Sequence, residues 1–251
     1  MLLFDAGNSR CKWVRVEAGA WRQQGVLDNS DASAWLILKT TFADMPAPKK
    51  ILLSNVAGAE MERRIRALCT IWQGPVELIV AKSEQCGVRN GYDQPAQLGS
   101  DRWAALIAAW HQGHGACLVV NCGTATTVDA LSASGDFMGG LILPGMELMQ
   151  HSLLQRIAQL GLENGSVREF PLNTADAIAS GVMRANIGAI QHQFALLEAQ
   201  FQASCIVSGG AAEKILPYLT LKNSLVEHLV LQGLEVIGQN CSTNTQKETV
   251  A

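Results

Sequence analysis

The chain has 251 residues and a formal net charge of -3 at pH 7, and it is 48% hydrophobic and 16% charged. That composition supplies enough apolar material for a sizeable core, in one large domain or two fused halves. The mild acidity and the lack of a Lys/Arg block argue against a nucleic-acid partner, and no apolar run reaches the length of a membrane span.

The N-terminus begins directly with a predicted strand, so we expect no signal peptide. The seven cysteines form no Cys-x-x-Cys pair, and several of them lie in apolar runs. Buried free thiols in a reducing compartment explain this pattern better than disulfides or a metal site. We therefore predict a cytoplasmic protein.

The predicted elements fall into two similar series along the chain. The first series has strands at 2–5, 12–17, 21–27, 51–56 and 76–80, with helices at 31–43 and 59–71. Residues 82–98 have a loop-like composition, and a helix is expected at about 100–112. The second series has strands at 117–121, 126–131, 137–143, 205–208 and 226–231, with helices at 145–160, 174–200 and 211–217.

Strands that mix hairpins with helical crossovers predict an α/β fold with mixed β-sheets. Because the series occurs twice, we expect two duplicated lobes with a cleft between them, where ligands usually bind. The expected division is an N-terminal lobe at 1–115, a C-terminal lobe at 116–240 and a flexible polar tail at 241–251.

Each half contains the same short motif, an apolar run followed by an Asx residue, any residue, Gly and several small polar side chains. The two copies are Asp5-Ala6-Gly7-Asn8-Ser9-Arg10-Cys11-Lys12 and Asn121-Cys122-Gly123-Thr124-Ala125-Thr126-Thr127. The pattern predicts a strand, a tight turn and a returning strand. Exposed N–H groups and short polar side chains in such a turn suit phosphates, so two facing hairpins would hold a nucleoside triphosphate.

Asp5 is predicted to end the first strand, where a carboxylate beside a phosphate-binding turn is a natural holder of Mg²⁺ through water. The alternative is an Asp that only starts a turn. Lys12 on the returning strand either reaches a phosphate or is simply exposed. In the second hairpin, Thr124 and Thr126 are candidate donors to phosphate oxygens, unless the segment is only a Thr-rich edge hairpin.

A third motif is Gln97-Leu98-Gly99-Ser100-Asp101-Arg102-Trp103. Ser100 is predicted to cap the helix that follows, which puts Asp101 and Arg102 in its first turn. Asp101 would then accept the proton of an attacking alcohol, and Arg102 would hold a carboxylate in a bidentate fork. An Asp that merely complements the helix dipole remains the alternative.

Further along, Ser208-Gly209-Gly210 follows a predicted strand and opens a helix. Two glycines would let a flat ligand such as a purine approach the backbone closely. A plain strand-to-helix turn is the simpler interpretation.

With these motifs the chain resembles the type III pantothenate kinases, within the superfamily of acetate and sugar kinases, chaperone ATPases and actin. The resemblance covers nearly the whole chain, and the Gly-Ser-Asp-Arg-Trp block is its most specific part. It implies two ribonuclease H-like (actin-like ATPase) lobes. Its other matches are Asp5 to Trp13, Gly123 to Asp129, Gly139-Gly140, Pro144-Gly145, Asn173-Thr174 ahead of Ala177 and Gly181, and Ser208-Gly209-Gly210.

The resemblance implies transfer of the ATP γ-phosphate to pantothenate, giving 4'-phosphopantothenate in the first step of coenzyme A biosynthesis. Asp101 would be the catalytic base. Pantothenate would be bound by Tyr92, Gly99, Ser100, Asp101, Arg102 and Thr174. ATP would be bound by Asp5, Ala6, Gly7, Asn8, Ser9, Arg10, Cys11, Lys12 and Thr124, with Asp5 also holding Mg²⁺ through water. The family also implies a homodimer in which the partner subunit completes the pantothenate site.

One position departs from the family pattern. Asn121 stands where the family often has an Asp that helps to hold a monovalent cation, K⁺ or NH₄⁺. We hypothesise that this protein depends less on K⁺ or lacks the ion. Two other functions stay open, a related kinase acting on a sugar or short acid, and a catalytically weak nucleotide-binding regulatory or accessory protein.

Overall fold

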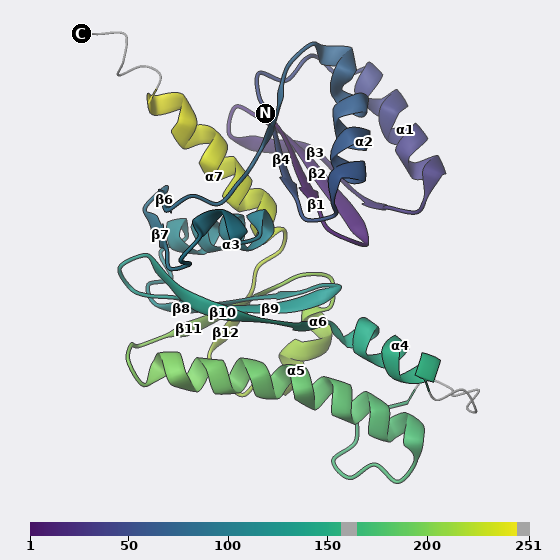
Figure 1. Ribbon diagram of the computed structural model, residues 1–251, viewed down its shortest axis with the longest axis vertical. Helices are drawn as coiled ribbons and strands as arrows, with labels where there is room; N and C mark the ends of the chain where they lie inside the picture. The colour runs from purple at the N-terminus through teal and green to yellow at the C-terminus, as the bar shows by residue number, and fades with distance from the viewer. Residues whose placement is uncertain (157–164, 245–251) are drawn as a thin grey trace. The chain divides into compact units, whose positions relative to one another are not determined.

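The computed structural model describes residues 1–156 and 165–244 (Figure 1). The chain divides into two compact units, one formed by Met1–Gln112 together with the segment from Leu229 onward, and the other by Gly113–His228. No helix in the described residues is both long and apolar enough to cross a bilayer.

The first unit is built on a five-stranded mixed sheet in the order β3-β2-β1-β4-β5. Strand β1 is antiparallel to β2 and parallel to β4. The strands are β1 (Leu2–Ala6), β2 (Arg10–Glu17), β3 (Ala20–Asp28), β4 (Ile51–Asn55) and β5 (Val76–Leu78). The helices are α1 (Ala32–Ala43), α2 (Ala59–Cys69), α3 (Ser100–His111) and α7 (Leu229–Asn244).

The pleat of β1 sorts its side chains between the two faces of this sheet. Leu2, Phe4 and Ala6 belong to the core packed under α1 and α2, together with Cys11 of β2 and Leu53 of β4. Because side chains alternate along a strand, the intervening positions face the opposite side, where α3 and α7 pack (Figure 1). This alternation decides which polar side chains reach the first turn of α3.

The second unit repeats the topology, with its strands in the order β12-β11-β8-β9-β10. Strand β8 is antiparallel to β9 and parallel to β11, as β1 is to β2 and β4. The long helix α5 (Thr174–Glu198) covers one face (Figure 1). The strands are β8 (Cys117–Cys122), β9 (Ala125–Leu131), β10 (Asp136–Pro144), β11 (Ser204–Ser208) and β12 (Asn223–Leu225), and the other helices are α4 (Met146–Arg156) and α6 (Ala212–Ile215).

The duplicated α/β fold with mixed sheets is confirmed, but two predicted elements are wrong. The stretch 226–231 is not a strand: Leu229 begins α7, and β12 ends at Leu225. A short apolar run fits a strand or a buried helix equally well, and Val230, Leu234 and Ile237 in fact follow a helical period. The loop predicted at 82–98 contains the hairpin of β6 (Glu84–Gln85) and β7 (Val88–Asn90).

The C-terminal segment differs from two predictions: it was assigned to the second lobe up to residue 240, and to a flexible tail from residue 241 onward. Helix α7 groups with the first unit because it packs along α3, where a side chain at Gly233 would overlap the Ala104 backbone. Residues 241–244 continue this helix, and the rest of the predicted tail, 245–251, lies outside the described residues. The helix predicted at 145–160 is described as far as Arg156, and its predicted last residues, 157–160, also lie outside the described residues.

Candidate active site

Three neighbouring strands of the first unit bring Asp5, Lys12 and Ser54 side by side. Asp5 is paired in register with Lys12 across the antiparallel β1–β2 ladder and with Ser54 across the parallel β1–β4 ladder. Residues directly opposite on adjacent strands point to the same face, so all three face α3. The site therefore has a carboxylate flanked by an amine and a hydroxyl.

The turn between β1 and β2 is the predicted phosphate hairpin. It closes through the Gly7 N–H, which donates to the Arg10 carbonyl oxygen at 3.0 Å. Asn29 secures it, since its Nδ2 donates to the carbonyl oxygens of Gly7 (2.7 Å) and Asn8 (2.9 Å). Asn8, Ser9 and Arg10 are exposed at the tip. The turn thus presents its tip to solvent on a backbone that Asn29 holds.

Two residues of the predicted ATP-binding run have side chains that face away from the tip. Ala6 and Cys11 are fully buried in the core under α1 and α2. Burial raises the pKa of the Cys11 thiol, so it stays neutral. Only the backbone atoms of these two residues remain available to a ligand.

Helix α3 delivers Asp101 in its first turn, as predicted, but Ser100 is not its cap. The helix starts at Ser100, and the N-cap residue is Gly99, which has no side chain to bond. The Asp101 carboxylate accepts the N–H of Arg102 at 2.8 Å. A Cβ on Gly99 would lie 2.7 Å from Asp101 Oδ1, so glycine is needed for the carboxylate to occupy this position.

The side chains of Arg102 and Tyr92 contact each other in the first unit. Arg102 is buried, with 5% of its surface exposed, and its Nη1 donates to the Tyr92 hydroxyl oxygen at 2.8 Å. The guanidinium carbon lies 5.7 Å from the centre of the Tyr92 ring. A cation that is desolvated and oriented in this way suits a carboxylate ligand better than a freely moving surface arginine.

Asp5 and Asp101 are both desolvated carboxylates, and Asp101 lies near enough to affect Asp5. Burial raises the pKa of Asp5 to about 6; Lys12 opposes this shift and the nearby Asp101 reinforces it. Burial also raises the pKa of Asp101, while the Arg102 N–H and its charge pull the other way. Desolvated carboxylates near each other favour a proton or a bound cation.

Glycine backbone groups help to hold the second hairpin, between β8 and β9. The Gly123 N–H donates to the Ala125 carbonyl oxygen at 3.0 Å, and the Gly145 N–H donates to the Thr124 carbonyl oxygen at 2.8 Å. A side chain at Gly145 would overlap the backbone of Gly123 and Thr124. The Thr124 side chain is exposed at the tip.

Thr126, proposed above as a phosphate donor, is instead a core residue. It is 1% exposed, and its Oγ1 donates to Asn186 Oδ1 of α5 at 2.6 Å. Asn186 in turn donates to the Val182 carbonyl oxygen at 3.0 Å. Period-2 alternation puts Thr126 on the helix-covered face of β9, so that prediction was wrong.

Gly209 has a packing role beside the second hairpin. Its φ is +97°, and a Cβ there would overlap the Cys122 carbonyl oxygen and come 2.6 Å from Asn121 Oδ1. The Ala211 N–H donates to the same Cys122 oxygen at 3.0 Å. The glycine thus lets β11 approach the hairpin at the partly exposed Asn121.

Thr174 belongs to the second unit, as do Asn121 and Thr124, whereas Asp5, Tyr92 and Asp101 belong to the first. Thr174 is the exposed first residue of α5, directly after the N-cap Asn173, whose Oδ1 accepts the Asp176 N–H at 2.8 Å. The structure thus gathers the predicted residues in two groups, one in each unit.

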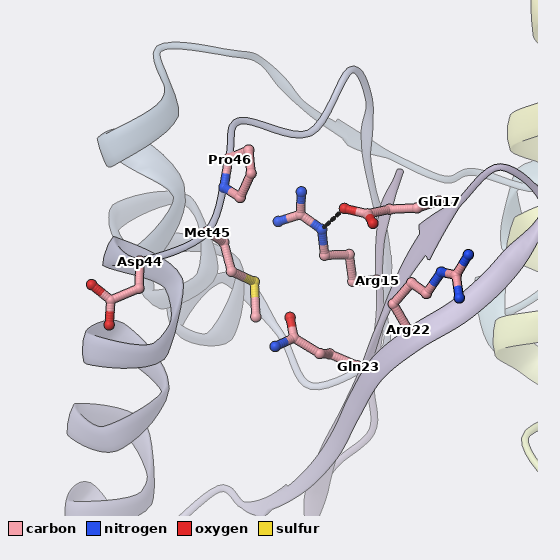
Figure 2. A pocket seen from close by; sticks show the side chains of 7 residues that line it. All are labelled: Arg15, Glu17, Arg22, Gln23, Asp44, Met45 and Pro46. Atoms are coloured by element: carbon pink, nitrogen blue, oxygen red, sulfur yellow. Dashed lines mark hydrogen bonds and ion pairs between the residues drawn. The ribbon is translucent and has the colours of Figure 1, made fainter.

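A pocket of about 380 Å³ in the first unit lies among other residues. Figure 2 shows the Arg15 guanidinium pointing into it and paired with Glu17, at 2.6 Å between Nε and Oε1. The remaining lining residues are Arg22, Gln23, Asp44, Met45 and Pro46. None of the predicted site residues lines this pocket.

Two polar residues at the site were missed by the sequence reasoning. Asn29 follows a strand in an Asp28-Asn29-Ser30-Asp31 run that indicates only a turn, and Ser54 follows the apolar run Ile51–Leu53. The change from apolar to polar residues at the end of this strand was the only signal for Ser54. Asn29 gave no local signal, because its contact with the hairpin spans more than 20 residues.

Two units with one topology, each carrying a phosphate-type hairpin, define an actin-like ATPase fold. MreB5 of Spiroplasma citri bound to AMPPNP has this fold at a TM-score of 0.52, with 11% identity over 98% of both chains. A Campylobacter jejuni protein assigned to the Baf family of transcriptional activators superposes at 0.60, with 21% identity over 96% of this chain and 100% of that one. At these identities the likeness shows the fold alone.

The family follows from sequence comparison. Residues 1–196 match the family model described as type III pantothenate kinase. A type III pantothenate kinase of Nitrosospira multiformis is 42% identical over 100% of this chain and 95% of its own length. One of Aromatoleum aromaticum is 45% identical over 95% of this chain and 98% of its own length. The chain belongs to the type III pantothenate kinase family.

Proposed function

We propose that this chain transfers the γ-phosphate of ATP to the primary hydroxyl of pantothenate, giving 4'-phosphopantothenate for coenzyme A synthesis. Family membership over the length of the chain carries the reaction class. The observation that carries the chemistry is Asp101, a desolvated carboxylate fixed in the first turn of α3. Phosphoryl-transfer enzymes act largely by positioning and electrostatic stabilisation of an in-line transfer.

In this mechanism Asp101 is the general base. Its carboxylate accepts the proton of the pantothenate hydroxyl as the oxygen attacks the γ-phosphorus and the ADP oxygen leaves. Burial raises the pKa of Asp101, which makes its ionised carboxylate a stronger base. Arg102, buried and oriented by Tyr92, binds the pantothenate carboxylate, and the backbone of Gly99 lies against the substrate.

The two hairpins bind the ATP phosphates. Asn8, Ser9 and Arg10 at the first tip and Thr124 at the second are the exposed polar groups for this role. Lys12 lies opposite Asp5 and neutralises phosphate charge. Asp5 suits a divalent cation, because its carboxylate is desolvated and close to a second one. Bound Mg²⁺ would offset charge on the phosphates, with Asp5 holding it through water.

For the monovalent cation, we propose that Asn121 reduces the requirement. The side chain offers a carbonyl oxygen and no charge, so the electrostatic attraction for K⁺ or NH₄⁺ is weaker than with a carboxylate. The residue is partly exposed, and its Oδ1 lies beside Gly209.

We further propose a cytoplasmic homodimer in which the partner subunit contributes Thr174 to the pantothenate site. Support comes from the segment before α5, where Phe170 is 84% exposed and Leu172 is 97% exposed. Large apolar side chains exposed so close together are typical of a contact surface. Their position next to Thr174 would bring that residue to the same interface.

The test measures ATP consumption coupled to detection of phosphopantothenate, with and without pantothenate, in Mg²⁺ plus either K⁺ or Na⁺. Pantothenate-dependent product in both salts is the expected result. Product only with K⁺ would keep the kinase and reject the proposal for Asn121. No product from folded dimeric protein would favour another small-molecule substrate or a regulatory role.

A further inference from the structure

A buried hydrogen bond joins the strand that carries Ser54 to the start of α3. Ser54 Oγ and Ser100 Oγ are 2.9 Å apart, and the Asn55 N–H donates to Ser100 Oγ at 3.1 Å. Ser54 is fully buried, and 7% of Ser100 is exposed. The Ser54–Ser100 bond is shielded from water and the Asn55 bond is partly shielded, and a lost hydrogen bond costs more in such surroundings than at the surface.

This serine pair, Ser54 and Ser100, lies between the two carboxylates of the site. Ser54 is in register with Asp5 on the parallel β1–β4 ladder, and Ser100 directly precedes Asp101. The α3 N-terminus has no side-chain cap, because its N-cap is Gly99. The bonds made by Ser100 therefore tie the first turn of α3 to the sheet, since the N-cap residue makes no side-chain bond there.

We propose that Ser54 and Ser100 are positioning residues that hold the Asp101 carboxylate at its working distance from Asp5 and the phosphates. This inference rests on the proposed kinase function. The family resemblance suggested that Ser100 binds substrate, but its hydroxyl is already engaged with Ser54 and the Asn55 N–H. Its side chain acts through Asp101, so it influences kcat rather than the affinity for pantothenate.

The expected effect follows from how strictly a general base must be placed. A shift of about 1 Å in a reacting group can cost 10²-fold in rate. Partners that orient metal ligands typically contribute about 10- to 100-fold, and we expect a similar range for residues that orient a general base. We expect Ser100→Ala to lower kcat about tenfold with the KM for pantothenate changed less than about twofold.

The experiment measures kcat, KM and melting temperature for S54A, S100A, S100T and the double alanine variant, and determines the crystal structure of S100A. If the pair acts as one unit, the double variant loses no more than S100A alone. S100T keeps the hydroxyl and should recover kcat to within about threefold of wild type. The crystal structure should show the Asp101 carboxylate displaced.

Ser132→Ala is the matched control. Ser132 is 4% exposed in the turn between β9 and β10, and its Oγ accepts the N–H groups of Ser134 (3.2 Å) and Asp136 (3.0 Å). Removing the Ser132 hydroxyl should lower the melting temperature by about as much as we expect for S100A, while leaving kcat at the wild-type value.

Three results would overturn the proposal: wild-type kcat in S100A, a rise in KM with unchanged kcat, or an unmoved Asp101 in the S100A crystal structure. Failure of the kinase function looks different. Wild type would then form no phosphopantothenate, and the serine pair would be judged on the position of Asp101 alone.

Discussion

The two hairpins share one sequence pattern but differ in what surrounds them. At the β1–β2 hairpin, the ionisable Asp5 lies beside Lys12 and near Asp101, and Asn29 holds the turn. At the β8–β9 hairpin, a neutral Asn121 takes the equivalent place, and Gly145 and Gly209 pack against the turn backbone. Duplication has thus kept the hairpin backbone in both copies. The ionisable groups are concentrated in the first.

The largest expected effect is on kcat and concerns the ionisable groups near the β1–β2 hairpin. Asp101→Ala should lower kcat by roughly 10²- to 10⁴-fold, because it removes the proton acceptor. The fold should persist, since Asp101 is only partly buried in the first turn of α3. Steady-state kinetics and circular dichroism check both statements. Near-normal turnover in the variant would remove Asp101 from the role.

At the β8–β9 hairpin, where glycines pack against the turn, Gly209→Ala should destabilise the protein by roughly 2–4 kcal/mol. The new Cβ would overlap the Cys122 carbonyl, and the φ of +97° is strained for alanine. Urea unfolding measures the loss. Gly188→Ala is the control, because Gly188 lies in the middle of α5 with open space around its Cβ position, and helix propensity predicts a gain of up to about 1 kcal/mol. Equal effects of the two substitutions would contradict the packing role.

Asp5→Asn should stabilise the protein while removing activity. The folded-state pKa of Asp5 is about 6 against 3.8 for the free group. The folded state therefore holds a proton that the unfolded state has lost between these values, so stability falls as pH rises through this window. In EDTA at pH 8 the variant should be more stable than wild type by roughly 1–3 kcal/mol, and the gap should close below about pH 4.

Asp28→Asn is the control for that prediction. Hydrogen bonds from Ser30 lower the pKa of the exposed Asp28 below its ordinary value of 3.8. Its ionised carboxylate therefore stabilises the folded state at pH values above 3.8, the opposite of Asp5. Urea unfolding across pH should show no gain in the Asp28 variant. A gain there equal to that of Asp5→Asn would mean that general charge removal, and not desolvation, explains the effect.

A smaller contrast separates two threonines of the second hairpin. Thr126→Val should cost roughly 1–3 kcal/mol of stability and leave the KM for ATP unchanged, because its hydroxyl bonds Asn186 in the core. Thr124→Val should do the reverse, raising the KM for ATP severalfold at unchanged stability. Thermal unfolding and ATP titrations measure the two effects. A higher KM for ATP in the Thr126 variant would return that residue to the phosphate site.

The smallest predicted effect concerns the neutral Asn121. In wild type, replacing K⁺ by Na⁺ should change turnover only a few-fold, and Asn121→Asp should increase the response to K⁺ by restoring a charge. Initial rates at constant ionic strength provide the measurement. Collapse of wild-type activity in Na⁺ would refute the hypothesis.

Local patterns were enough to predict the duplicated topology, both hairpins and the first-turn position of Asp101. Strand alternation, Gly turns and helix period are encoded within a few residues, so a single sequence reveals them. The family resemblance added the assigned roles at positions such as Tyr92 and Thr174, which no local pattern indicates.

Tertiary contacts decided the rest. The assignment of α7 to the first unit, the burial of Thr126 against Asn186, and the bond between Ser54 and Ser100 each join residues 46 or more positions apart. A short apolar run such as Leu229–Leu231 is compatible with a strand or a helix until its packing partner is known. Partners so distant in sequence leave no local pattern, because packing selects among conformations that local propensities leave close in energy.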